Sequence, residues 1–234
     1  MKQKRIGGIL ILYLLIIAVF LTVTYLTSAA TTVVARMIPR ERSNTIVIDA
    51  GHGGEDGGAT SCAGIPESTY NLEIAIKLDD LFHLLGYRTV MIRTTDKSVY
   101  TQGDTIAAKK VSDLRQRVKI VNGTEDAILV SIHQNTFSES RYSGAQVFYG
   151  PEGESGVLAE RLQGVFCEAL NPGSNRRAKK ADGIYLMQHI DCTGILVECG
   201  FLSNPEEEAA LRSPNYQRKI CCVIAATVGT FLTK

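Results

Sequence analysis

The feature that most constrains the fold is an alternation of short apolar runs with helical stretches from about residue 44 onward. Thr45–Ala50 and Ala127–Ile132 are nearly continuous apolar runs, which is typical of strands buried on both faces. Between them, apolar residues recur at three- and four-residue spacing on a helix that Gly86 can end: Leu72, Ala75, Leu78, Phe82 and Leu85. This order predicts an α/β domain with a mostly parallel, twisted sheet flanked by helices.

The rest of the chain continues the same alternation. We expect further strands at Arg88–Ile92, Ser143–Tyr149 and Gly194–Val197, and further helices at Val111–Asn122, Gly156–Leu170 and Asn215–Leu232. The polar stretch between Arg93 and Val111 is long enough for a surface loop and too short for a subdomain. The sequence therefore predicts a single domain over residues 44–234, a normal length for one core.

The N-terminus has the pattern of a membrane-targeting segment. Lys2, Lys4 and Arg5 precede an apolar run from Ile9 to Leu26, close to the roughly 20 residues that cross a bilayer as a helix. Positive charge before the run predicts that the rest of the chain is exported. The run exceeds the usual apolar region of a signal peptide, about 7–15 residues. We therefore expect residues 1–30 to form a transmembrane signal anchor, with a cleaved signal peptide as the alternative, and residues 31–43 to be a linker.

Charge and cysteine content limit the partners of the exported part. The net charge of the whole chain is +1, but residues 1–43 carry six Lys or Arg against one Glu, which leaves the remainder at −4. That sign argues against nucleic-acid binding. The six cysteines show no Cys-x-x-Cys spacing. We expect mostly free thiols, although export would permit disulfides.

Chemically versatile residues follow three of the predicted strands. His52, His133 and Glu198 come directly after or close to the ends of apolar runs, and Glu67 precedes the first helix. Ligands of open α/β sheets usually lie beyond the carboxyl ends of the strands. Two imidazoles and one carboxylate can form a catalytic zinc site with an open position for water. A further carboxylate could then serve as general base and acid.

Each of these residues also has an ordinary structural interpretation. A histidine at a strand end is commonly just hydrogen-bonded, and Glu67 could merely favour the dipole of its helix. The glycines around His52 could form a phosphate loop, but no phosphate-binding pattern follows them. Glu198 is harder to explain structurally, because a carboxylate at a buried strand end needs a partner. The other two histidines, His83 and His189, are not expected to be ligands.

Four motifs in order resemble the zinc-dependent N-acetylmuramoyl-L-alanine amidases of the amidase-3 family. These are VIDAGHGGEDGGA, the glutamate before the first helix, SIHQN and VECGFLSN, and the resemblance covers residues 44–234. It implies that His52, Glu67 and His133 bind Zn²⁺, that Glu198 is catalytic, and that residues 44–234 are the catalytic domain. Asn135 is a candidate substrate-binding residue, with loop capping as its alternative role.

The segments SDLRQRVKIVN, SGAQVFYG and DGIYLMQ resemble the sporulation-specific, CwlD-type members. This implies removal of stem peptides from muramic acid in peptidoglycan, so that muramic-δ-lactam forms in the spore cortex. Ala50 stands where the family often has proline, and the autoinhibitory insertion or wall-binding repeats of many relatives are lacking, which raises the question of an activating partner protein. Two rival hypotheses are a zinc carboxypeptidase acting within the stem peptide and a non-catalytic wall-binding protein, which would have no need of Glu198.

Overall fold

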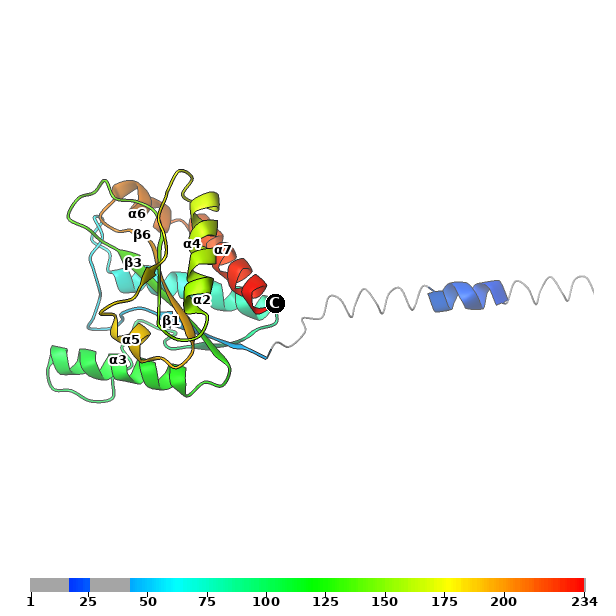
Figure 1. Ribbon diagram of the computed structural model, residues 1–234, viewed down its shortest axis with the longest axis horizontal. Helices are drawn as coiled ribbons and strands as arrows, with labels where there is room; N and C mark the ends of the chain where they lie inside the picture. Colours follow the sequence, from blue (N-terminus) through cyan, green and yellow to red (C-terminus); the bar gives the residue numbers. More distant parts are fainter. Residues whose placement is uncertain (1–16, 26–42, 234) are drawn as a thin grey trace, which may run out of the picture. The chain divides into compact units, whose positions relative to one another are not determined.

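The computed structural model describes residues 17–25 and 43–233 of the chain (Figure 1). The chain divides into two units, residues 1–40 and residues 41–234. Within the first unit, residues 17–25 are helical. Most of the apolar run Ile9–Leu26 expected to form an anchor, and most of the linker 31–43, lie outside the described residues. In the part that is described, no helix has the length and hydropathy needed to cross a bilayer.

The second unit is built on one six-stranded sheet. Its strands are β1 (Thr45–Ala50), β2 (Arg88–Met91), β3 (Ala127–Asn135), β4 (Gln146–Tyr149), β5 (Lys179–Lys180) and β6 (Thr193–Phe201). The order across the sheet is β2-β1-β3-β6-β4-β5. All neighbours are parallel except β4 and β6, which pair antiparallel. The prediction of a single α/β domain with a mostly parallel sheet is thus confirmed.

Helices cover both faces of this sheet. They are α2 (Glu67–Leu84), α3 (Ile106–Asn122), α4 (Ser155–Ala169), α5 (Tyr185–His189), α6 (Pro205–Leu211) and α7 (Pro214–Leu232). In Figure 1, α2, α4 and α7 lie on one side of the strands, and α3 and α5 lie on the other. Side chains of β1 alternate between the two layers, because Ile46 and Ile48 belong to the core under α2, α4 and α7 while Val47 belongs to the core under α3 and α5.

The first helix ends where the sequence indicates. Gly86 has φ of 79°, a left-handed conformation that glycine adopts without steric cost. Its amide donates to the His83 carbonyl, and the Tyr87 amide donates to the Phe82 carbonyl, both at 3.0 Å. These bonds satisfy carbonyls in the last turn of the helix. The chain is thereby turned directly into β2.

Several elements are longer than expected or were not expected. Helix α3 begins five residues before the predicted Val111, because the Thr105 side chain caps it by accepting a hydrogen bond from the Ala108 amide. The first turn of the helix carries no apolar stripe, so the hydrophobic pattern did not indicate this earlier start. Strands β3 and β6 continue beyond Ile132 and Val197 into polar residues, since backbone pairing does not depend on side-chain polarity. The short elements β5, α5 and α6 were not predicted. Of these, α6 could have been predicted, because asparagine followed by proline, here Asn204 and Pro205, is a typical helix start.

The strand order creates a crevice. From β1 the chain passes through α2 to β2 on one side, and then through α3 to β3 on the other side of β1. Strands β1 and β3 are therefore neighbours whose connections leave in opposite directions. The point where the strand order reverses in this way is called a topological switch point. The loops that follow the two strands separate there, and ligands commonly bind between them.

Candidate metal centre

His52 lies at the switch point, in the loop that follows β1. Its φ is 59°, which is uncommon for a residue with a side chain and stores strain unless the surroundings hold it. The Arg117 guanidinium provides that support by donating to the His52 carbonyl at 2.8 Å. The imidazole Nδ1 lies 3.0 Å from Asp56 Oδ2. A carboxylate on one ring nitrogen leaves the other, Nε2, free for a ligand and fixes the orientation of the ring.

Two buried arginines hold the backbone of this loop. Arg93 donates to the carbonyls of Ala50 at 2.8 Å and Gly51 at 3.0 Å. Arg117 also donates to the Ala50 carbonyl, at 3.0 Å, and pairs with the buried Asp49 carboxylate. Burial opposes ionisation of Asp49, but Arg117 together with His133 and the Ser131 hydroxyl outweighs it and keeps the pKa of that carboxyl below its ordinary value. Three consecutive carbonyls of the loop are thus bound to fixed cations.

His133 and Glu198 occupy neighbouring strands in register. They are paired positions of β3 and β6, so their side chains emerge on the same face of the sheet. The sequence placed both residues just after their strands, whereas the structure places them within the strands, where backbone pairing fixes them. Gly51 leaves room for the His133 ring, since a Cβ at Gly51 would lie 2.2 Å from His133 Nε2.

Glu67, the first residue of α2, lies between the two histidines. Its Oε1 is 3.0 Å from His133 Nδ1, and its Oε2 is 3.4 Å from His52 Nε2. One ligand atom from each of these three residues lies within 4.8 Å of the others. Among the described residues, this is the one group of His, Cys, Asp or Glu side chains arranged to hold a metal ion. The trio expected from the sequence is therefore brought together.

The Glu67 carboxylate is held as an anion. It accepts from the Gln134 and Ala59 amides, both at 3.1 Å, and from Asn71 Nδ2 at 3.2 Å. Burial opposes its ionisation, but the hydrogen bond and charge of His133, with His52 and Ala59, lower its pKa to about 2. Burial also opposes protonation of His133, yet its bond to Glu67 and the nearby carboxylates raise the His133 pKa above its ordinary value. Glu67 is therefore an anionic ligand for a cation, whose binding would replace the proton that His133 otherwise holds.

Glu198 differs from Glu67 in its surroundings. Its Oε2 is buried and has no hydrogen-bond partner in the described part of the chain. Burial raises its pKa to about 7, and Glu67 adds to this effect while His133 opposes it. Two adjacent carboxylates thus have pKa values pushed in opposite directions, a pattern that separates a ligand from a proton carrier.

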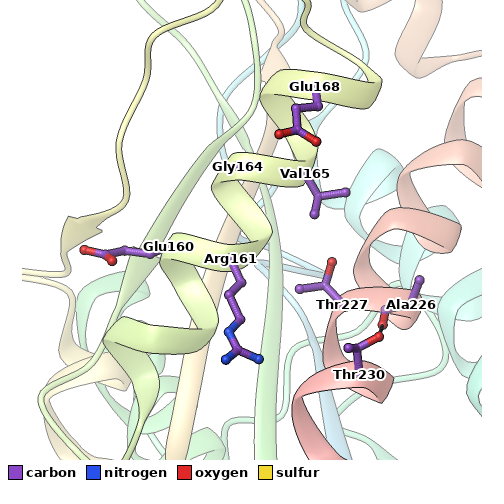
Figure 2. A pocket seen from close by; sticks show the side chains of 8 residues that line it. All are labelled: Glu160, Arg161, Gly164, Val165, Glu168, Ala226, Thr227 and Thr230. Atoms are coloured by element: carbon purple, nitrogen blue, oxygen red, sulfur yellow. Dashed lines mark hydrogen bonds between the residues drawn. The ribbon is translucent and has the colours of Figure 1, made fainter.

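A hollow of about 260 Å³ lies at the site, and its lining includes His52, His133, Glu198, Asp49 and Arg117. A larger hollow, of about 410 Å³, lies between α4 and α7 (Figure 2). There, Arg161 and Val165 of α4 face Thr227 and Thr230 of α7, and no histidine or cysteine lines the space. The larger hollow offers no set of metal ligands or catalytic groups, so the chemistry belongs to the smaller one.

The two other histidines lie away from the metal-ligand group. His83 is an exposed residue of α2 that contacts Asp79 and Thr89, and His189 stacks on Tyr185 of α5. Neither belongs to the metal-ligand group. Asn135 lies at the end of β3, two residues beyond His133. All six cysteines are free thiols in the structure.

The functional residues that sequence reasoning missed are Arg93 and Arg117. An arginine on a helix is usually solvent-exposed, so Arg117 was not considered. It lies three residues after Leu114 and four before Val121, on the inward face of α3. This helical spacing could have indicated that Arg117 is buried. Arg93 follows β2 and had no comparable signal.

Comparison with known proteins shows the family of the chain. The family described as N-acetylmuramoyl-L-alanine amidase matches residues 46–229. The chain belongs to this amidase-3 family. It is 37% identical over 191 residues to the germination-specific N-acetylmuramoyl-L-alanine amidase of Bacillus subtilis, covering 81% of this chain and 80% of that protein.

Solved amidases share the fold. The CwlD amidase of Clostridioides difficile, solved in complex with the GerS lipoprotein, superposes with a TM-score of 0.77 at 34% identity and covers 81% of this chain and 98% of that one. An N-acetylmuramoyl-L-alanine amidase of Clostridium difficile 630 gives a TM-score of 0.71 at 27% identity, with 82% and 98% covered. The resemblance seen in the sequence motifs is confirmed, and the protein is an enzyme of the amidase family.

Proposed function

We propose that this amidase is zinc-dependent and hydrolyses the bond between the lactyl carbonyl of N-acetylmuramic acid and L-alanine in peptidoglycan. One observation carries the proposal. His52, Glu67 and His133 converge beside a second carboxylate, Glu198, that is partly buried and has an oxygen without a hydrogen-bond partner among the described residues. Two imidazoles and a carboxylate are the donor set of a catalytic zinc site. The anionic Glu67 and the orientation of His52 by Asp56 suit that ion.

The residues of the site divide the chemistry between them. Zinc, when bound by His52, Glu67 and His133, supplies an activated water and polarises the scissile carbonyl. Glu198 accepts the proton of the attacking water and delivers a proton to the alanine nitrogen as the amide bond breaks. A carboxyl with a pKa near 7 can perform both transfers at neutral pH, and such transfer typically contributes about 10²–10⁴-fold. Asn135, at the same rim, is proposed to hydrogen-bond the substrate.

We further propose that the amidase acts on spore cortex, where peptide removal precedes muramic-δ-lactam formation. The identity to a germination-specific amidase supports this role. Residues 1–30 are proposed to export the catalytic domain and anchor it to the membrane, supported by the charge and apolar pattern of that segment. An activating partner protein is also proposed, because the related CwlD amidase was solved with a lipoprotein.

The test is muropeptide analysis by mass spectrometry after incubation of peptidoglycan with the full-length protein. An amidase releases intact peptides beginning with L-alanine, whereas a carboxypeptidase releases only terminal amino acids. Glu198→Gln should abolish release while metal content stays near one per chain, because this side chain transfers protons and does not bind the ion. Glu125→Gln, exposed at the opposite end of β3, is the matched control and should behave as wild type. Loss of metal from Glu198→Gln would move Glu198 into the ligand set.

A further inference from the structure

A group of aromatic rings lies on the loop between β3 and β4. Phe137 is 51% exposed, and its ring contacts that of Tyr142 with centroids 4.8 Å apart. Tyr142 in turn stacks over Phe201, which is buried at the end of β6, with centroids 6.4 Å apart and planes inclined by 29°. We call Phe137, Tyr142 and Phe201 the aromatic platform. Phe201 forms its base and Phe137 is its solvent-facing part.

The platform continues the rim of the metal centre. His133 pairs with Glu198, and the next pair along the same two strands, after a shift of register, is Asn135 with Phe201. Phe137 follows Asn135 by two residues. At about 3.3 Å per residue, four residues of extended chain span at most about 13 Å. The exposed ring of Phe137 therefore lies within the reach of a polymeric substrate that occupies the centre.

The loop that carries the platform is fixed by hydrogen bonds from outside the loop. These are Phe137 N to Ser203 Oγ at 3.1 Å, Asn204 Nδ2 to the Tyr142 carbonyl at 3.3 Å, Arg176 Nη2 to the Ser143 carbonyl at 3.0 Å, and Gly144 N to Glu207 Oε1 at 2.7 Å. Glu207 also accepts from the Phe201 amide at 2.8 Å. Because the loop is already ordered, a ligand that binds there does not have to fix it.

The two guanidinium groups at the platform are bound within the protein, that of Arg141 by a carboxylate and that of Arg176 by a backbone carbonyl. Arg141 lies over the Tyr142 ring, 5.3 Å from its centroid, and forms an ion pair with Glu139 at 2.8 Å. Arg176 lies over the Phe201 ring at 5.1 Å and is bound to the loop backbone. A surface of this kind does not select for an anion. It suits an uncharged ligand that combines a flat face of C–H groups with hydroxyl and amide groups.

We propose that the aromatic platform binds an N-acetylated sugar of the glycan strand, next to the muramic acid whose peptide is removed. The C–H face of the pyranose ring lies against the electron-rich face of Phe137, while Arg141 donates to sugar oxygens. This inference rests on the proposed function, because it assigns the glycan part of the same substrate. It explains why the chain exposes a phenyl ring on a fixed loop at the rim.

The absence of tryptophan from the chain permits a direct test. Phe137→Trp in the full-length protein retains a stacking ring and introduces a sole indole at the platform. Its fluorescence should change saturably on titration with the tetramer of N-acetylglucosamine, which contains no peptide and no carboxylate. Leu84→Trp is the matched control, since Leu84 is 73% exposed at the end of α2, and its fluorescence should not change.

A second variant measures the contribution to catalysis. Phe137→Ala should raise KM for polymeric peptidoglycan by roughly three- to tenfold, the range expected for loss of one aromatic contact, with kcat within about twofold of wild type. Phe137→Tyr should restore KM. The proposal is overturned by an unresponsive Phe137→Trp protein, by a response to free stem peptide instead of the sugar, or by a Phe137→Ala effect confined to kcat. Because the titration needs no hydrolysis, failure of the amidase proposal would be seen separately, as intact peptides in mass spectrometry.

Discussion

Substituting alanine for Gly51 tests whether His133 must sit where the structure places it. The backbone at Gly51 lies outside the left-handed region, so alanine suits its conformation. The cost comes from the side chain, because the new Cβ would lie 2.2 Å from His133 Nε2, 2.3 Å from Cε1 and 2.7 Å from Cδ2. Ordinary contact begins at 3.4 Å. The ring must therefore withdraw by more than about 1 Å, whereas ligand distances tolerate only about 0.2 Å.

Two measurable effects follow from that displacement. Overpacking should destabilise the domain by about 1–3 kcal/mol, which lowers the Tm by roughly 2–12 °C at about 2–4 °C per kcal/mol for a domain of this size. Removal of His133 from the ligand set should weaken zinc binding by more than about 100-fold, since changes outside the ligand set already cost 10–100-fold. Amidase activity should fall with zinc content.

The assay is zinc content after equilibration in zinc buffers, together with thermal unfolding followed by circular dichroism. Gly164→Ala is the matched control, because Gly164 lies inside α4 and a Cβ there meets nothing within 4 Å. It should raise stability by about 0.5–1 kcal/mol and leave zinc binding unchanged. A folded Gly51→Ala protein that binds zinc as tightly as wild type would refute the assignment of His133 as a ligand.

Replacing either His52 or His133 with alanine should remove both metal and activity, because the two remaining ligands hold zinc poorly. His189→Ala should keep both. Loss of metal from His189→Ala would show that the wrong histidines were assigned as ligands. In the metal-free protein the pKa of Glu198 is raised to about 7 from 4.5. The folded state therefore holds the Glu198 proton more tightly than the unfolded state does. The resulting stabilisation is complete below about pH 4.5, and roughly 3 kcal/mol of it is lost as the pH rises through about 7. The Tm of the wild type should therefore fall between pH 5 and pH 8 relative to Glu198→Gln, and parallel curves would contradict its burial. The full-length protein should fractionate with membranes and resist extraction by salt, whereas recovery of a soluble form beginning near residue 31 would identify a cleaved signal peptide.

One rule of chain geometry predicted that the side chains of the candidate site would lie together. Parallel strands end at the same edge of a sheet, so His52, His133 and Glu198 were expected together once three apolar runs were identified as strands. Glu67 was added by its place at the start of a helix that returns from that edge. The roles proposed for these four residues come from the resemblance of the motifs to the amidase-3 family.

The missed features depend on contacts between distant parts of the chain. The two-residue strand β5 exists through its pairing with β4, and its residues, Lys179 and Lys180, carry no strand signal. The buried state of Arg117 depends on Asp49, 68 residues earlier, and no local pattern reports such a pairing. The extent of β3 beyond Ile132 depends on β6 in the same way.

The two arginines that hold the loop after β1 have a consequence for the metal-free enzyme. In many small zinc domains, the free energy of metal binding is also the free energy of folding. Here Arg93 and Arg117 fix the loop backbone with buried charges of the chain itself, and a large core lies beneath it. A chelator would therefore empty the site and leave a folded protein that can be refilled. If the enzyme is zinc-dependent as proposed, hydrolysis would follow the supply of free zinc, while the amount of folded enzyme stayed constant.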